Sequence, residues 1–320
     1  MDMFDEVLAG ERLALARLLT LVENDTPKGR AALDYLYPHA GKAHLVGVTG
    51  SPGTGKSSLV NQLAKAFRFA GVQKVAVIAV DPSSPFTGGA LLGDRVRMRD
   101  LSGDPGVFIR SMASRGALGG LSRATASAAQ VLDAAGFEII LIATVGAGQS
   151  EIDIARLAHT VVVVEAPGLG DDIQAIKAGI LEIADILVVN KCDLPGADRT
   201  ARALKMMLEM AHPTRPGQMT ANAFWPVPVL LACATGCAGV DEIIQAIRSH
   251  RQFLESSGEW QHRELEHLRS SLDATLRDLL LQRLHDRLAG GAYEDVLARL
   301  ASRELSPFEA IETLLEEKLG

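Results

Sequence analysis

The sequence HLVGVTGSPGTGKSS, His44 to Ser58, contains an apolar run that leads into a glycine-rich loop and then into a helical pattern. The loop, Gly50 to Ser57, matches the phosphate-binding pattern Gly-x4-Gly-Lys-Ser. Glycines in such a loop let backbone N–H groups close around a phosphate at the positive end of the following helix. The stretch therefore predicts a strand, a phosphate-binding loop and a helix in succession.

The residues of this loop have distinct predicted roles. Lys56 is expected to reach the β- and γ-phosphate oxygens, and the Ser57 hydroxyl is expected to ligate Mg²⁺. A chance glycine-rich turn is the alternative, but the flanking strand and helix patterns disfavour it. The predicted nucleotide contacts in the loop are Ser51, Gly53, Thr54, Gly55, Lys56, Ser57 and Ser58.

Outward from the loop, short apolar runs alternate with segments of helical pattern. Continuous Val, Ile and Leu runs separated by helices predict a mainly parallel sheet that is covered by helices on both faces. We therefore predict an α/β fold with a P-loop domain at 42–255. The six further runs lie at residues 74–80, 106–112, 137–143, 160–167, 184–190 and 226–234.

Helical patterns flank this domain on both sides. Apolar residues at helical spacing predict one amphipathic helix at 4–23 and a second helix at 28–37, within an N-terminal segment at 1–41. After the domain, leucines at three- and four-residue steps predict one long amphipathic helix through 265–288.

The C-terminal segment, 256–320, contains a further helix start. SPFE, Ser306 to Glu309, has Ser at the N-cap, Pro at the first helical position and Glu two residues later, which is a capping box. The apolar stripe of the long helix needs a partner surface. The segment either packs against its own domain or forms a dimer, and the sequence leaves both possibilities open.

The composition limits the classes of partner. The chain has 320 residues and a net charge of -7, which argues against nucleic acid because such binders need a basic face. The acidic N-terminus lacks a signal-peptide pattern, and no apolar run approaches the ~18 residues of a membrane span. Three cysteines are too few for a disulfide framework. We expect a cytoplasmic protein with free thiols and neither nucleic acid nor a membrane as partner.

A second motif, NKCD at Asn190 to Asp193, follows an apolar run and matches the guanine-recognition pattern Asn-Lys-x-Asp. The Asp193 carboxylate can accept from two N–H groups on the edge of guanine, whereas adenine would leave a buried carboxylate unpaired. The motif therefore favours GTP and GDP over ATP. CAT, at the end of the next run, is expected to meet the base from a neighbouring loop. The predicted base contacts are Asn190, Lys191, Asp193, Cys233, Ala234 and Thr235.

Two acids after the second apolar run are candidates for the metal and for the attacking water. Asp81 follows that run directly, and Asp94 lies beyond a segment rich in Pro, Ser and Gly. Both can hold the waters of Mg²⁺ and orient the attacking water, although each could instead cap a turn. We predict Lys56, Asp81 and Asp94 as catalytic residues, Ser57, Asp81 and Asp94 as the metal site, and Arg97 as a phosphate or partner contact.

The order of these motifs resembles one known family. DPSSPFTGG from Asp81, TVGAGQSE from Thr144, PGLGDDIQAIKAGILEIAD from Pro167 and NKCD are similar to the G-protein chaperones of adenosylcobalamin-dependent acyl-CoA mutases. The likeness covers nearly the whole chain. It implies a homodimeric P-loop GTPase that binds the mutase, gates the transfer of cobalamin into it and helps to remove damaged cofactor. The chain lacks an Asp-x-His-x-x-Gly cobalamin motif, so it is not expected to hold the cofactor itself.

The resemblance also implies roles for two segments that follow apolar runs. Gly146 to Glu151 would form a second switch, in which Gln149 is a catalytic candidate. Gly168 to Lys177 would communicate with the mutase. The implied switch and partner residues are Arg97, Gly146, Gly148, Glu151, Gly170, Asp171 and Lys177.

At one position the chain departs from this family. The family reads Glu-Thr-Val-Gly where this chain reads ATVG from Ala143. A carboxylate there would hold Mg²⁺ through water, and Glu138 cannot replace it because it lies about 16 Å away along the strand. We expect GTP to bind, since the loop and guanine motif are intact, but Mg²⁺ affinity or turnover to be low. The sequence fits both a natural variant and a deliberate substitution.

Two other functions remain open. A nickel-inserting GTPase could use Cys192, Cys233 or Cys237, although these cysteines lack metal-ligand spacing and the chain has no His-rich tract. A small-molecule kinase would pass the phosphate to an acceptor rather than to water. His262 and His267 are five residues apart and would not share a helix face, so we expect both to be solvated.

Overall fold

The computed structural model describes residues 2–81, 98–101, 103–113, 120–144, 154–168, 178–211, 224–287 and 291–316. The chain divides into two compact units, Met1–Leu268 and Arg269–Gly320. The first unit contains the sheet, and the described elements of the second are all helices.

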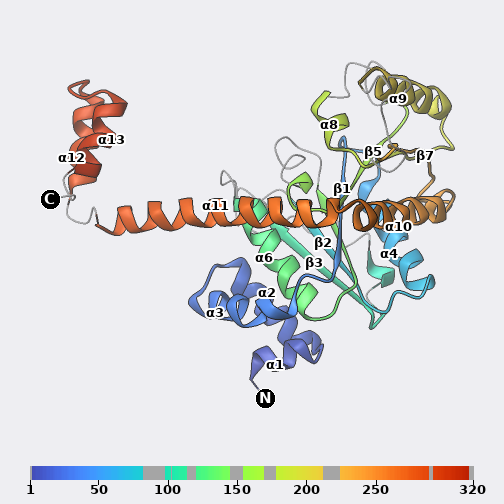
Figure 1. Cartoon of the computed structure of the whole chain (residues 1–320), viewed down its shortest axis with the longest axis horizontal. Coiled ribbons are helices and arrows are strands. Elements are labelled where there is room, and N and C mark those ends of the chain that lie inside the picture. The colour runs from blue at the N-terminus through green and yellow to red at the C-terminus, as the bar shows by residue number, and fades with distance from the viewer. Residues whose placement is uncertain are drawn as a thin grey trace. The chain divides into compact units, whose positions relative to one another are not determined.

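All seven predicted apolar runs form strands of one parallel sheet (Figure 1). The strand order is β3-β2-β4-β1-β5-β6-β7, so the strand that leads into the glycine-rich loop is central. The predicted α/β fold is confirmed. The strands are β1 (His44–Thr49), β2 (Val75–Asp81), β3 (Val107–Ala113), β4 (Ile139–Thr144), β5 (Thr160–Glu165), β6 (Ile186–Val189) and β7 (Val229–Leu231).

Helices join the strands, as parallel pairing requires. Among the described residues, the helices of the first unit before Gly258 are α1 (Met3–Leu8), α2 (Arg12–Glu23), α3 (Pro27–Leu36), α4 (Lys56–Phe69), α6 (Gly120–Ala134), α8 (Ala178–Ile183), α9 (Ala197–Ala211) and α10 (Val240–Ser257). Short 3-10 turns are η1 (Tyr37–His39) and η2 (Arg99–Leu101). α4 connects β1 to β2, and α6 connects β3 to β4.

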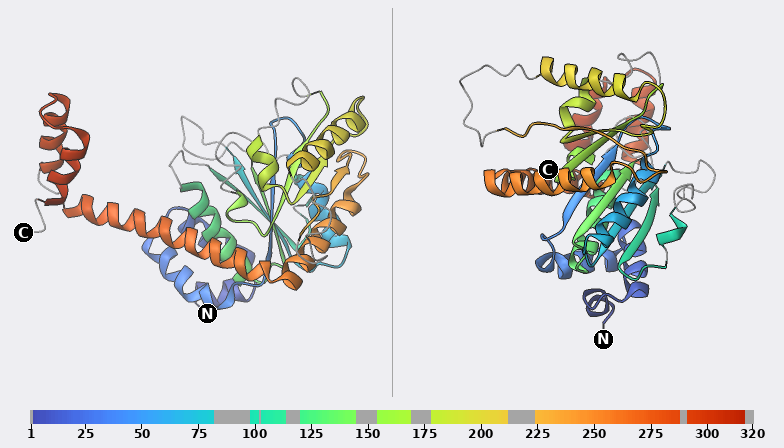
Figure 2. Two further views of the ribbon diagram at one scale, coloured as in Figure 1. Left: turned by 45° about the horizontal axis from the view of Figure 1, so that its top comes forward. Right: turned by 90° about the vertical axis from the view of Figure 1, so that its right-hand side faces the viewer.

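Successive residues of the central strands point to opposite faces of the sheet, and each face has its own apolar core. On one face, Val75 and Val77 of β2 pack in a cluster with residues of α4 and α10. On the other face, Ala76 and Ile78 pack with residues of α2, α3 and α6. Figure 2 shows helices on either side of the sheet. Burial of both faces explains why these strands read as continuous apolar runs rather than alternating ones.

The single N-terminal helix predicted at 4–23 is wrong, because this segment forms two helices. The turn between α1 and α2 contains Gly10 at a φ of +85°, a conformation that L side chains rarely adopt. The second predicted helix is α3, and it begins after Thr26, whose hydroxyl accepts the N–H of Gly29. Leu18 of α2 is fully buried in the core shared with α6.

The long C-terminal helix is confirmed as α11, Glu259–Arg287. It is followed by α12, Ala292–Ala301, and α13, Pro307–Glu316. The predicted capping box is present, because Glu309 N–H donates to the Ser306 hydroxyl and Ser306 N–H donates to the Glu309 carboxylate. Over the described ranges, every helix is either too short or too polar to cross a membrane.

Candidate nucleotide-binding site

The glycine-rich loop lies at the carboxyl end of the central strand, between β1 and α4. Ligands of α/β sheets bind at this edge, and the helix N-terminus there favours an anion. β4 and β5 flank β1 on its two sides, so the residues that end these strands border the loop.

Three glycines give the loop a backbone that other residues would not adopt. Gly50, Gly53 and Gly55 have φ values of +133°, +82° and +90°. A Cβ at Gly50 would lie 2.0 Å from the carbonyl oxygen of Val164, and a Cβ at Gly55 would lie 2.5 Å from Nδ2 of Asn190. The loop is therefore pressed against β5 and the guanine motif, where only glycine fits.

Lys56 is the first residue of α4, and its side chain folds back over the loop. Its ammonium group donates to the carbonyl oxygens of Gly50 at 2.7 Å and Ser51 at 2.8 Å. Ser57 and Ser58 follow in the first turn of the helix and are partly buried. An ammonium group and a helix N-terminus thus converge on the loop, which is a chemistry that suits phosphate.

The guanine motif contacts the phosphate loop directly, although the two are far apart in the sequence. Asn190 donates from Nδ2 to the carbonyl oxygen of Thr54, and Lys191 donates from Nζ to that of Gly53, both at 2.7 Å. Asn190 also accepts the N–H of Ala234 at 3.1 Å. The structure therefore brings the phosphate loop, the NKCD motif and the CAT loop together at one edge of the sheet.

The thiol of Cys233 lies against the acid of the guanine motif. Its Sγ donates to Oδ1 of Asp193 at 3.2 Å and lies 3.3 Å from the Thr235 hydroxyl. Burial raises the pKa of the adjacent Cys192 thiol, and the neighbouring Cys233 and Asp193 raise it further. All three cysteines, including Cys237, are free thiols. No cysteine belongs to a cluster of described residues that could hold a metal ion.

Glu165 is a residue of this site that the sequence reasoning missed. It ends β5, is 6% exposed, and accepts the Ser51 hydroxyl on Oε1 at 3.1 Å. Its carbonyl oxygen accepts the N–H of Asn190 at 2.7 Å. The available signal was an acid at the end of the otherwise uncharged run TVVVVE.

Several predicted residues lie outside the described part of the chain. Asp81 ends β2 and pairs there with Ala113 of β3, but its side chain falls outside the described residues. The other predicted residues outside the described part of the chain are Asp94, Arg97, Gly146, Gly148, Gln149, Glu151, Gly170, Asp171 and Lys177.

Ala143 is a core residue of β4. It is 2% exposed, pairs with Val48 of β1 and Ala79 of β2, and belongs to the apolar cluster that includes α4. Glu138 lies at the other end of this run, where its carboxylate accepts the N–H of Gln73. In the described structure, no acid of β4 reaches the phosphate loop.

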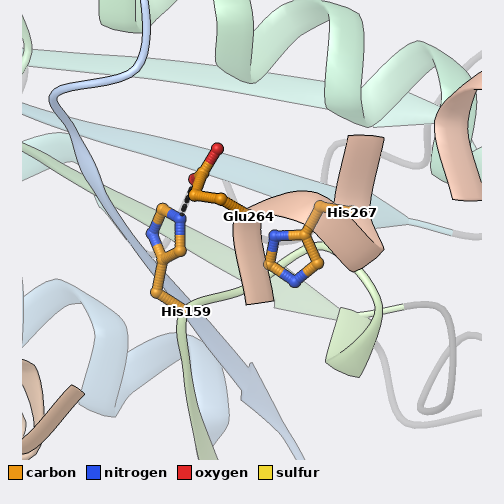
Figure 3. A group of neighbouring side chains, drawn as sticks. All are labelled: His159, Glu264 and His267. Atoms are coloured by element: carbon orange, nitrogen blue, oxygen red, sulfur yellow. Dashed lines mark hydrogen bonds and ion pairs between the residues drawn. The ribbon is translucent and has the colours of Figure 1, made fainter. Parts of the chain in front are cut away.

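A second polar cluster lies at the opposite, amino-terminal edge of the sheet. His159 precedes β5, while Glu264 and His267 belong to α11, and one ligand atom from each lies within 4.8 Å of the others (Figure 3). Burial, together with the neighbouring His159, lowers the pKa of His267 to about 4. The prediction that His267 is solvated is wrong: its side chain is partly buried beside His159, which lies too far away in the sequence for residue spacing to reveal the contact.

The hydrogen bonds of His159 argue against a metal ion in this cluster. Nδ1 accepts the backbone N–H of Leu45 at 3.0 Å, so a neutral ring carries its proton on Nε2. A metal would need the lone pair of Nε2, and metal-bound histidines donate from their other ring nitrogen. Nε2 bonds Glu264 instead, and this bond holds the pKa of Glu264 below its usual value. The cluster is therefore a hydrogen-bonded junction between strand and helix.

The fold and the joined phosphate and guanine motifs define a P-loop GTPase. The family model described as methylmalonyl Co-A mutase-associated GTPase MeaB matches residues 15–289, and the chain belongs to this family. A putative GTPase of Pyrococcus abyssi is 44% identical over 319 residues, covering 100% of this chain and 97% of that protein. The mitochondrial methylmalonic aciduria type A homolog of Caenorhabditis elegans is 30% identical, covering 99% and 82%. A solved structure of an LAO/AO transport system kinase has a TM-score of 0.71 and 28% identity, covering 100% and 97%.

Proposed function

We propose that this GTPase is a chaperone of an adenosylcobalamin-dependent acyl-CoA mutase, and that it gates the loading of cobalamin and protects the loaded enzyme. The observation that carries the proposal is the match over residues 15–289 to a family described as associated with methylmalonyl-CoA mutase. The name of the relative in Caenorhabditis elegans, a methylmalonic aciduria homolog, supports the same client. GTP hydrolysis would then time the release of the mutase.

In this proposal GTP binds where the glycine-rich loop meets the guanine motif. Lys56 and the loop N–H groups would hold the phosphates, and Asp193 would accept from the guanine edge. The position of Ser57 in the first turn of α4 suits Mg²⁺ ligation through its hydroxyl. The proposed residues for the waters of Mg²⁺ and for the attacking water are Asp81, Asp94 and Gln149.

The proposal also extends to the partner surfaces. The segment Gly168 to Lys177 follows β5, whose last residue contacts the phosphate loop, and we place the mutase contact there. We also infer a homodimer, since exposed leucines line the second unit. The free thiols fit a cytoplasmic setting.

GTP turnover with Mg²⁺, measured with and without an apo methylmalonyl-CoA mutase, tests the proposed function. We expect the mutase to raise turnover, because a client that binds beside the nucleotide can position the groups that act on the attacking water. Asp193→Asn is the matched control, since it replaces one of the two oxygens that would accept from the guanine edge with an N–H donor, and we expect it to abolish both GTP binding and stimulation. A rate of GTP turnover that the mutase does not raise would contradict the chaperone role. Phosphate transfer to a small-molecule acceptor would favour the kinase alternative, and stoichiometric nickel binding would favour metal insertion.

A further inference from the structure

Glu165 is a buried carboxylate beside the phosphate loop. It is 6% exposed and ends β5, whose other residues are Thr160 and four valines. Burial of an ionised carboxylate is costly unless hydrogen bonds compensate for the lost water. The roles proposed above for the nucleotide site make no use of this acid.

Both the side chain and the backbone of Glu165 contact the nucleotide site. Oε1 accepts the Ser51 hydroxyl at 3.1 Å, and the carbonyl oxygen accepts the N–H of Asn190 at 2.7 Å. Asn190 in turn donates from Nδ2 to the carbonyl oxygen of Thr54 at 2.7 Å. The phosphate loop, the end of β5 and the guanine motif therefore form a closed set of hydrogen bonds with Glu165 as one member.

Ser51 transmits this contact to the phosphate-binding groups. Its carbonyl oxygen accepts the ammonium group of Lys56 at 2.8 Å and the Thr54 hydroxyl at 2.9 Å. The preceding residue, Gly50, already packs against the β5 backbone so closely that a Cβ would lie 2.0 Å from the carbonyl oxygen of Val164. The hydrogen bond from the Ser51 hydroxyl to Glu165 adds a side-chain restraint where the loop separates from the β5 backbone.

Glu165 does not replace the acid that is absent at Ala143. β4 and β5 lie on opposite sides of β1, and Ala143 pairs with Val48 inside the strand, whereas Glu165 contacts Ser51 in the loop beyond it. The carboxylate therefore acts on the loop through Ser51.

We propose that Glu165 is a positioning residue of the nucleotide site, which holds Ser51 so that the phosphate loop and the guanine motif bind one nucleotide as a unit. This inference rests on the nucleotide site proposed above. It assigns Glu165 a role in binding GTP and GDP alike, because both nucleotides use the loop and the guanine motif.

A double-mutant cycle on Glu165 and Ser51 tests the proposal by GDP and GTP titration. We expect Glu165→Ala and Ser51→Ala each to weaken binding about tenfold, which is the effect of losing one hydrogen bond to a charged group. The double variant should bind nucleotide about as well as the single variant with the lower affinity, because both changes remove the same hydrogen bond. Glu165→Gln keeps an acceptor oxygen and Ser51→Thr keeps a hydroxyl, so each should bind within about threefold of the unaltered chain.

Three results would overturn the proposal: unchanged binding by Ser51→Ala, losses that multiply in the double variant, or an equal loss in Glu165→Gln and Glu165→Ala. Thermal unfolding without nucleotide monitors the fold. If Glu165→Ala does not fold, the comparison of Ser51→Ala with Ser51→Thr decides, since Ser51 is only partly buried. GDP binding by the unaltered chain, and its loss in Lys56→Ala, tests the nucleotide site separately.

Discussion

Single residues at the nucleotide edge act mainly by holding one another. Asp193, the acid expected to read guanine, accepts from the thiol of Cys233 at 3.2 Å. A thiol is a weak donor, so this bond restrains the carboxylate less than a hydroxyl would. The identity of residue 233 should therefore tune guanine affinity without touching the phosphates.

We expect Cys233→Ala to weaken GDP binding by about threefold to tenfold, because a hydrogen bond of this kind contributes about 0.5–1.5 kcal/mol. Cys233→Ser keeps a donor and should bind at least as tightly as the unaltered chain. Equilibrium titration with a fluorescent GDP analogue measures both. Cys237→Ser, at an exposed thiol, is the matched control. Equal binding by the alanine and serine variants would show that the donor has no role.

Ala143 occupies the position where the family carries a Glu. Ala143→Glu would supply a carboxylate at the end of β4, and we expect it to raise GTP turnover by about tenfold, or about 1.4 kcal/mol in the barrier. GTP turnover measured against Mg²⁺ concentration checks this, with GDP affinity in EDTA as the control that should not change. Since Ala143 is a core residue, thermal unfolding must show that the variant folds. No change in turnover or in Mg²⁺ dependence would mean that the chain does not need this acid.

At the scale of elements, a buried polar network joins α10 and α11 to the amino ends of the strands. Asp185, just before β6, accepts the N–H of Val161 at 2.8 Å and two bonds from Arg263 at 2.9 Å. Burial would raise the pKa of Asp185, but the His250 ring, whose Nε2 lies 3.3 Å from Oδ1, and the hydrogen bonds from Arg263 outweigh it and hold the pKa at about 2. The network fixes the first turns of α11 within the first unit.

His267 should make this attachment sensitive to acid. In the folded protein the pKa of His267 is about 4, below the ordinary value of 6.5, so the folded state binds fewer protons than the unfolded state between these pH values. The free energy of unfolding therefore decreases as pH falls from 6.5 to 4. The depressed pKa of Glu264 acts in the same direction below 4.5. We expect His267→Leu to reduce this decline in the free energy of unfolding. Urea unfolding followed by tryptophan fluorescence measures it, because Trp260 stacks on His159 in the same cluster. His262→Leu, exposed on the same helix, is the control and should keep the decline.

The strands were predictable because a sheet buried on both faces imposes continuous apolar runs, and the order of motifs located the phosphate loop and the guanine motif. Contacts set by strand register were not predictable. Glu165 meets Ser51 only because β5 lies beside β1, and His267 meets His159 only because α11 returns to the start of β5. The break at Gly10 was missed because apolar spacing continues through it, while the positive φ that ends the helix leaves no periodic signal.

The helices of the second unit leave many of their apolar side chains exposed. Val296 and Ala310 are buried between α12 and α13, but large apolar side chains remain exposed. On the part of α11 in this unit these include Leu272, Leu276, Leu280 and Leu281, at 52–67% exposure. A row of exposed leucines of this kind marks a protein-binding surface.

We expect the leucine row to form the homodimer contact, since a symmetric pair of such helices buries the same patch of both copies. Leu272→Glu combined with Leu276→Glu places charges in that patch, and burying them unpaired is costly. Sedimentation velocity should therefore change from a dimer to a monomer. Asp273→Ala with Arg277→Ala, two exposed polar residues of the same stretch, is the matched control and should remain dimeric. A dimer that survives the glutamate variant would place the contact on another surface, and a monomer in the unaltered chain would leave the leucine row for a different protein partner.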